Sequence, residues 1–186
     1  MFEVTAQFID ESFLTSRTPI NANIDIKLIA PFILTAQDQR IQPILGTALY
    51  VRLMDGIANS NLTPNEEKLI RICQPALAYW TLHTAIPFIG IEIRGAGVVR
   101  PTNEKIQPAT VTEMGLLQNE SKNIAEFYSQ RIQDWLCQNP TMYPEYTVAQ
   151  TSIKPIKPTF DGGIYYGSQN KFDPTFYSNE DEIGCC

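Results

Sequence analysis

The sequence predicts a mainly α-helical protein: a small helical bundle with one short β-hairpin and extended arms at both ends. Two long stretches carry apolar residues at helical spacing. By contrast, residues 140–186 lose that spacing yet hold eight of the 19 aromatic residues. We therefore expect an N-terminal arm over residues 1–22, a helical domain over 23–139 and an extended C-terminal arm over 140–186.

The N-terminal part divides into an arm and a first helical segment. The first twenty residues alternate apolar and polar positions, which is typical of an extended arm or edge strand. Helical spacing begins near Asn23 and is interrupted by Pro31 and Pro43. Gly46 is placed to end this segment, and Thr47 is placed to cap the helix that follows.

The most apolar helix is predicted to begin at Thr63-Pro64-Asn65-Glu66. This run combines a capping threonine, a proline at the first helical position and a glutamate three residues after the cap. Pro75 should kink the helix, and Pro87 and Gly90 should end it. The uncharged stretch in its second half contains prolines and polar residues, which favours a buried helix over a membrane span.

A β-hairpin is expected near residues 91–100. Two short β-branched runs flank Gly95-Ala96-Gly97, and such a turn tolerates positive φ angles. A phosphate-binding loop would need a further glycine and a following helix, whereas Pro101 follows here. The clearest helix then runs from Thr112, its expected cap, to Cys137, before Asn139-Pro140.

The C-terminal arm is rich in aromatic residues and proline, and it is too short to build a core of its own. Disordered tails are typically poor in aromatic residues, so the composition favours an arm that docks on its own domain or on a neighbour. A flexible tail is the alternative reading. The candidate contact residues are Phe160, Tyr165, Tyr166, Phe172, Phe176 and Tyr177.

The charge balance excludes a protein that coats nucleic acid. The chain has 14 Lys and Arg against 20 Asp and Glu, a net charge of −6 and a pI near 4.8. Charged residues make up 18%, below the ~25% of typical domains, which fits a surface covered by partners and an ordinary acidic soluble protein equally well. No signal peptide or membrane attachment is expected, and the sequence assigns no role to the terminal pair Cys185 and Cys186.

Catalytic and cofactor motifs are not recognised in the sequence. The single histidine, His83, lies inside the most apolar helix, where a core or interface position is favoured over a general base. No nucleotide-binding loop, nucleophile elbow or zinc-protease motif occurs, and the cysteines lack ligand spacing. We therefore expect no catalytic residue, no metal and no cofactor.

Four motifs carry a resemblance to a known family over roughly residues 25–146. They are Pro43-Ile44-Leu45-Gly46-Thr47-Ala48-Leu49-Tyr50, Ala76-Leu77-Ala78-Tyr79-Trp80-Thr81-Leu82, Ile124-Ala125-Glu126-Phe127-Tyr128 and Asn139-Pro140-Thr141-Met142-Tyr143-Pro144-Glu145-Tyr146. The chain resembles the small helical head–tail connector proteins of tailed phages, also called ring or head-completion proteins. The nearest relatives are those of crAss-like and other Bacteroidales phages.

The resemblance implies a structural virion protein in the neck, assembled in the host cytoplasm. It implies a ring, of twelve copies if the family stoichiometry holds, that joins the portal to the next ring or the tail. DNA would pass through the ring during ejection without specific binding, because an acidic lining repels phosphate. Arg94 and Arg100 beside the hairpin turn are candidate portal or subunit contacts, although solvated side chains explain them equally well.

Two further functions compete with the connector. One is a monomeric accessory or regulatory module that docks one partner through its aromatic C-terminal arm. The other is an enzyme whose active site has no sequence motif, because catalytic groups converge in space and not in sequence.

Overall fold

A computed structural model describes residues 6–20, 26–89, 92–94, 97–99, 110–147 and 153–156. These residues are mainly helical, which confirms the predicted class. In chain order the elements are α1 (Glu11–Arg17), α2 (Ile26–Ala36), a π-helical turn η1 (Gln37–Ile41), α3 (Gln42–Leu45), α4 (Thr47–Ala58), α5 (Pro64–Ile89), β1 (Glu92–Arg94), β2 (Gly97–Val99), α6 (Val111–Gln138), a 3-10 turn η2 (Pro140–Met142) and α7 (Pro144–Thr147).

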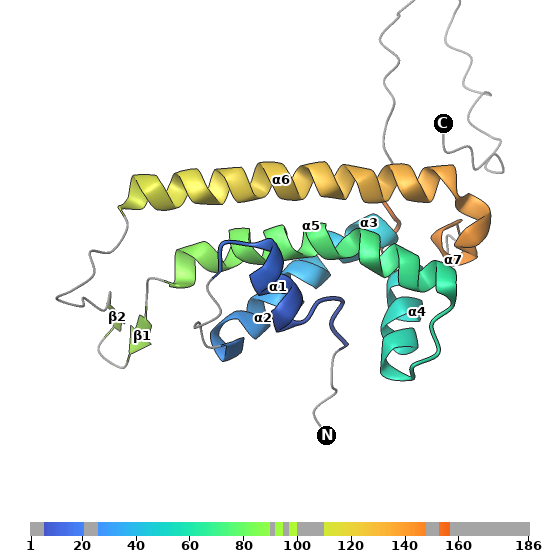
Figure 1. Ribbon diagram of the computed structural model, residues 1–186, viewed down its shortest axis with the longest axis horizontal. Coiled ribbons are helices and arrows are strands. Elements are labelled where there is room, and N and C mark those ends of the chain that lie inside the picture. The colour runs from blue at the N-terminus through green and yellow to red at the C-terminus, as the bar shows by residue number, and fades with distance from the viewer. Residues whose placement is uncertain are drawn as a thin grey trace, which may run out of the picture.

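Helices α5 and α6 form the long axis of the molecule. They contain 26 and 28 residues, and at 1.5 Å per residue each is about 40 Å long. They lie side by side and run in opposite directions, with α1, α2 and α4 on the other side of α5 (Figure 1). The indole Nε1 of Trp80 on α5 donates a hydrogen bond to Ser129 Oγ on α6 at 2.9 Å.

The start of α5 confirms the predicted capping box. Glu66 N donates to Thr63 Oγ1 at 3.3 Å, and Thr63 N donates to Glu66 Oε2 at 2.6 Å. Glu66 also pairs with Arg52 of α4, whose Nε lies 2.8 Å from Glu66 Oε1. Because Glu66 is buried, this carboxylate ties the beginning of α5 to α4.

We expect Glu66→Ala to lower the free energy of unfolding by about 2–3 kcal/mol. The substitution removes the cap partner and leaves the Arg52 guanidinium without its buried carboxylate. The matched control is Glu67→Ala, because Glu67 makes an exposed pair with Arg71 at 3.4 Å that contributes about 0.5 kcal/mol or less. Urea denaturation measures both variants, and equal losses would contradict the assignment.

The end of α5 differs from the prediction, because the helix continues through Pro87 to Ile89. A proline has no N–H to donate, so Pro87 leaves the carbonyl of His83 without its usual helical partner. Gln118 Nε2 on α6 donates to His83 O at 3.4 Å, and His83 Nδ1 donates to Gln118 O at 3.0 Å. The neighbouring helix therefore provides a bond at the position where proline removes one.

The N-terminal residues correct the expected arm at 1–22. Within the described part, residues 11–17 form helix α1, capped by Asp10, whose Oδ1 accepts from Phe13 N at 2.8 Å. Phe8, Leu14 and Ile20 are buried in the core, as is Ile9. Helix α1 buries only Leu14, so it has no apolar period for a sequence pattern to detect.

The segment from α2 to α4 follows the predicted helical spacing with one correction. Gly46 ends α3 with φ +75°, as expected for a glycine stop. However, Thr47 is the first residue of α4 and does not cap it, since Gly46 occupies the cap position.

The start of α6 also differs from the prediction. Thr110 caps this helix and forms a reciprocal capping box with Glu113, so Thr112 lies inside the first turn.

Residues 92–99 contain the two described strands. β1 and β2 pair antiparallel, with Glu92 opposite Val99 and Arg94 opposite Gly97.

After α6, residues 140–147 form η2 and α7 in place of the beginning of an extended arm. The reason is burial: the rings of Tyr143 and Tyr146 are 1% exposed and complete the core beneath the end of α6.

Candidate interaction surfaces

The residues predicted from sequence as interface contacts are not brought together in the described part of the chain. Arg94 ends strand β1, of which the backbone alone is described. Arg100 lies outside the described residues, as do Phe160, Tyr165, Tyr166, Phe172, Phe176 and Tyr177. Two other surfaces, which the sequence analysis missed, stand out in the structure.

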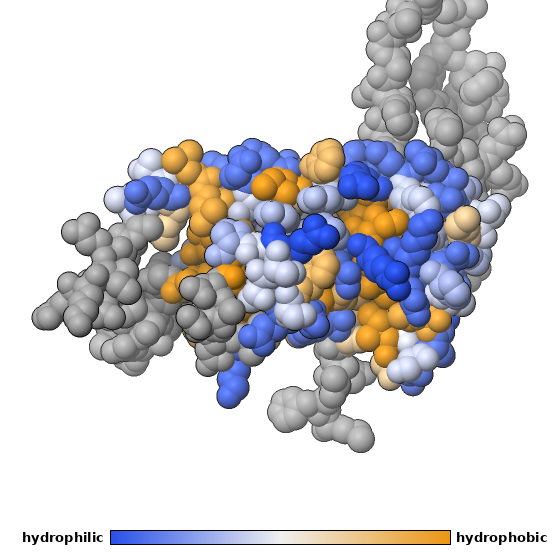
Figure 2. Space-filling model, in the orientation of Figure 1, coloured by the Kyte–Doolittle hydropathy of each residue, from blue (hydrophilic) through white to orange (hydrophobic). Residues whose placement is uncertain are grey.

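The first surface is apolar and lies at the end of the molecule where α5 ends. Leu28 and Phe32 are one turn apart on α2, and Phe88 and Ile89 are the last two residues of α5. The rings of Phe32 and Phe88 stack with centroids 5.2 Å apart. We call Leu28, Phe32, Phe88 and Ile89 the apolar end surface. Figure 2 shows further hydrophobic residues on one face of the molecule at this end of the helix pair.

Three of the four side chains of the apolar end surface are exposed to solvent, and Phe32 is half-buried. Leu28 is 62% exposed, Phe88 54% and Ile89 45%. Val111, at the start of α6, is 73% exposed and belongs to the same end of the helix pair. Scattered exposed hydrophobic residues are ordinary, whereas a contiguous exposed apolar group is a candidate interaction surface.

The second surface is the corner between α3 and α4, where a C-terminal segment docks. Residues 153–156 lie against Pro43, Gly46 and Thr47, which we call the Gly46 corner. Thr47 N donates to Ile153 O at 3.1 Å, and Ile156 N donates to Pro43 O at 2.9 Å. Ile153 N also donates to Thr47 Oγ1 at 3.3 Å. Main-chain bonds of this kind hold an extended peptide with little demand on its side chains.

Gly46 is required at this corner for two reasons. Its φ of +75° with ψ of 156° is a conformation that is essentially restricted to glycine. In addition, a Cβ at this position would lie 2.9 Å from Pro155 Cδ. The absence of a side chain therefore lets Pro155 approach the backbone of the corner.

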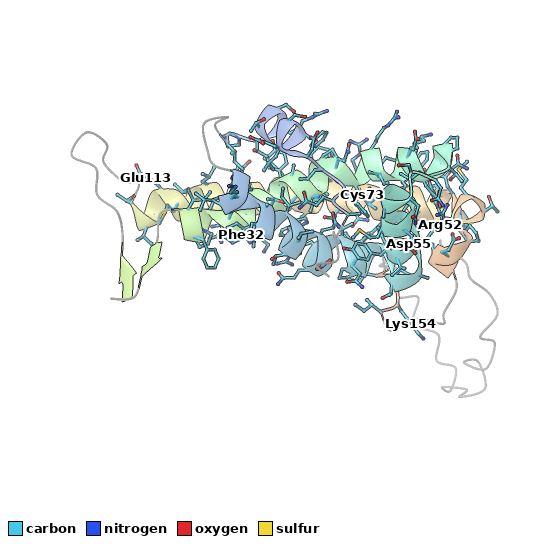
Figure 3. All side chains as sticks on the ribbon, turned by 90° about the horizontal axis from the view of Figure 1, so that it is seen from below. Phe32, Arg52, Asp55, Cys73, Glu113 and Lys154 are labelled. Atoms are coloured by element: carbon cyan, nitrogen blue, oxygen red, sulfur yellow. The ribbon has the colours of Figure 1, made fainter. Side chains whose placement is uncertain are left out.

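The two surfaces lie toward opposite ends of the long axis. Phe32 lies near one end, and Glu113 marks the start of α6 there, whereas Lys154 of the docked segment lies toward the other end (Figure 3). The described chain thus has an apolar surface toward one end of its long axis and the docked residues 153–156 toward the other.

The titratable groups inside the body serve the fold. Complete burial raises the pKa of the Cys73 thiol, which keeps it protonated and unreactive. Burial and a hydrogen bond to Asp38 raise the pKa of Tyr50, whose hydroxyl donates to Asp38 Oδ1 at 2.6 Å. His83 Nδ1 is committed to Gln118 O. Among the described residues, His, Cys, Asp and Glu form no group of three or more that could hold a metal ion.

A shallow open groove lies beside α1, but its polar groups are also used by the fold. Its lining includes Phe8, Asp10, Phe13 and Gln74. Asp10 caps α1, and Gln74 Nε2 donates to Phe8 O at 2.8 Å. The groove therefore offers a ligand few free polar partners.

The described chain defines a class: a mainly helical protein with an elongated antiparallel helix pair, an apolar end and a docked C-terminal segment. The sequence model of DUF6712, a family of unknown function, matches residues 41–156, and the chain belongs to this family. No curated protein and no solved structure matches the chain. Within the described residues, no helix has the length and apolar character needed to cross a membrane.

The family match includes the whole Gly46 corner and its docked segment. It begins at Ile41, the buried last residue of η1, and extends to Ile156. It also includes Phe88 and Ile89 of the apolar end surface, while Leu28 and Phe32 precede it. The aromatic residues from Phe160 onward follow the match.

Proposed function

We propose that the protein is a structural subunit of a phage neck, a ring below the portal that joins the capsid to the tail and continues the DNA channel. The observation that carries the proposal is that two different surfaces lie at opposite ends of one subunit. Closed rings are built from head-to-tail contacts, in which each copy uses two different surfaces. The apolar end surface and the C-terminal arm that leaves the Gly46 corner supply two such surfaces.

The partners in this proposal are further copies of the chain in a twelve-membered ring, the portal protein, and an adjacent ring or tail protein. The net charge of −6 per copy supports an acidic assembly through which DNA passes without specific binding. Arg94 and Arg100 of the β-hairpin would contact the portal or a neighbouring subunit. The proposal includes no catalytic activity, and it places the protein in the host cytoplasm during assembly and in the virion afterwards.

The docked segment also favours a second candidate function, a monomeric binding module. Residues 153–156 bind their own chain and fix the beginning of the aromatic arm. An arm fixed in this way could grip one partner without any ring. The two functions differ in whether the protein occupies the virion neck in several copies.

The decisive experiment is co-purification with the portal protein followed by cryo-electron microscopy of the complex and of the virion neck. We expect helical density of this fold in a ring below the portal. A double variant, Arg94→Glu with Arg100→Glu, should weaken portal capture or ring closure. Its control, Arg71→Glu with Arg131→Glu, changes the same charge at exposed positions on α5 and α6. Absence from the neck together with no portal binding would reject the connector.

A further inference from the structure

We propose that the aromatic C-terminal arm of one copy, residues 157–186, covers the apolar end surface of a second copy. This inference rests on the proposed ring and deepens it by naming the subunit contact. Each copy would then donate an arm at one end and accept an arm at the other.

The chemistry of the two partners matches. The apolar end surface exposes Phe88, which stacks on the half-buried Phe32, together with Leu28 and Ile89. Burial of such groups is favourable by roughly 25 cal/mol per Å². The arm contains six aromatic residues within thirty, and few other segments of the chain could supply as much apolar surface. These residues are Phe160, Tyr165, Tyr166, Phe172, Phe176 and Tyr177.

The length of the arm and its point of departure favour a second copy. At about 3.3 Å per residue, thirty extended residues span up to roughly 100 Å. Helix α5, with 26 residues, is about 39 Å long. An extended arm therefore exceeds the length of its own body, and Lys154, shortly before the arm begins, lies away from Phe32 of the surface that the arm would cover (Figure 3).

The bonds at the Gly46 corner give the arm a fixed origin. The three hydrogen bonds from residues 153–156 to Pro43 and Thr47 hold the chain immediately before the arm. An arm that is held at its origin reaches its neighbour with a smaller loss of conformational freedom than a freely moving tail. Covering its own end surface would use both surfaces within one molecule and leave no contact for closing a ring.

A complementation experiment with full-length chains tests the contact. One variant, Phe88→Asp, loses the end surface and keeps the arm. A second variant replaces the six aromatic residues of the arm with serine and keeps the end surface. Phe127→Asp is the matched control, because Phe127 is 61% exposed on α6 and lies outside the apolar end surface. Circular dichroism first establishes that each chain is folded. If Phe88→Asp is unfolded, Ile89→Asp replaces it.

Sedimentation velocity and native mass spectrometry measure the oligomeric state of each variant and of the mixture. We expect the unmodified chain and Phe127→Asp to self-associate with rising concentration, and each of the other two variants alone to remain monomeric. An equimolar mixture of those two should form a one-to-one dimer and no larger species. In that dimer Phe88→Asp supplies the one intact arm, and the serine variant supplies the one intact end surface.

Three results would overturn the contact: a monomeric unmodified chain, self-association of Phe88→Asp like that of the unmodified chain, or a mixture that stays monomeric. A protein found in the virion neck whose variants fail to complement would keep the connector function and reject this contact alone.

Discussion

Replacing Gln37 with leucine is expected to lower the free energy of unfolding by about 3 kcal/mol. Gln37 is fully buried in η1, and both ends of its amide are used. Its Oε1 accepts from Phe8 N at 2.9 Å, while Nε2 donates to Ala6 O at 3.1 Å and to Tyr50 Oη at 3.1 Å. Leucine preserves the volume but leaves a buried N–H without a partner, and each such group costs about 1–3 kcal/mol.

The same substitution should release the N-terminal segment before the rest of the fold. Among the described residues, Gln37 and Gln74 are the side chains that bond the backbone of residues 6–8, so removing Gln37 leaves one described side chain, Gln74, bonded to it. Urea denaturation gives the loss of stability, and limited proteolysis with mass spectrometry locates the first cut.

Gln39→Leu is the control, because Gln39 lies two residues away in the same turn and is exposed. Its expected effect is about 0.5 kcal/mol or less. Equal losses for the two variants, or an uncut N-terminal segment in Gln37→Leu, would reject this role for Gln37.

Replacing Gly46 with alanine is expected to cost about 2–3 kcal/mol and to detach residues 153–156. Alanine at φ +75° and ψ 156° is strained by about 1–3 kcal/mol, and its Cβ would meet Pro155. If the segment moves away to relieve the contact, the bond from Ile156 N to Pro43 O is lost. Hydrogen exchange of the Ile156 amide should then accelerate strongly, while exchange in α5 follows the global stability.

Gly115→Ala provides a control with the opposite sign. Gly115 lies inside α6, and a Cβ there would meet nothing within 4 Å. Alanine should therefore stabilise the protein by about 0.5–1 kcal/mol through helix propensity. A Gly46→Ala protein with unchanged stability and a protected Ile156 amide would refute the account of the corner.

Local signals in the sequence predicted the long helices well. The start of α5 follows from Thr63 and Glu66 because a capping box needs only residues three apart. Gly46 was also predicted as a helix stop from a local signal. A glycine that ends a helix with a positive φ angle needs no partner from a distant part of the chain. The errors at Thr112 and Pro87 arose where the deciding partner was a different residue, Thr110 in one case and Gln118 in the other.

The candidate surfaces depend on contacts between distant parts of the chain, which a single sequence does not reveal. Phe32 and Phe88 meet only because α2 packs beside the end of α5. Residues 153–156 carry no periodic pattern, and their docking is decided by backbone bonds to Pro43 and Thr47. Tyr143 was assigned to the arm because its burial depends on the cavity beneath α6, including the bond from its hydroxyl to Asn65 O.

The Gly46 corner also sets an order of events during synthesis. Its bond between Ile153 N and Thr47 Oγ1 joins residues 106 positions apart, so the ribosome completes α4, α5 and α6 before the partner segment exists. Contacts between residues so far apart in sequence form late, because closing a long loop costs conformational entropy. That cost is smaller once the local helices have ordered most of the chain. The segment before the arm therefore docks only on a finished helical body.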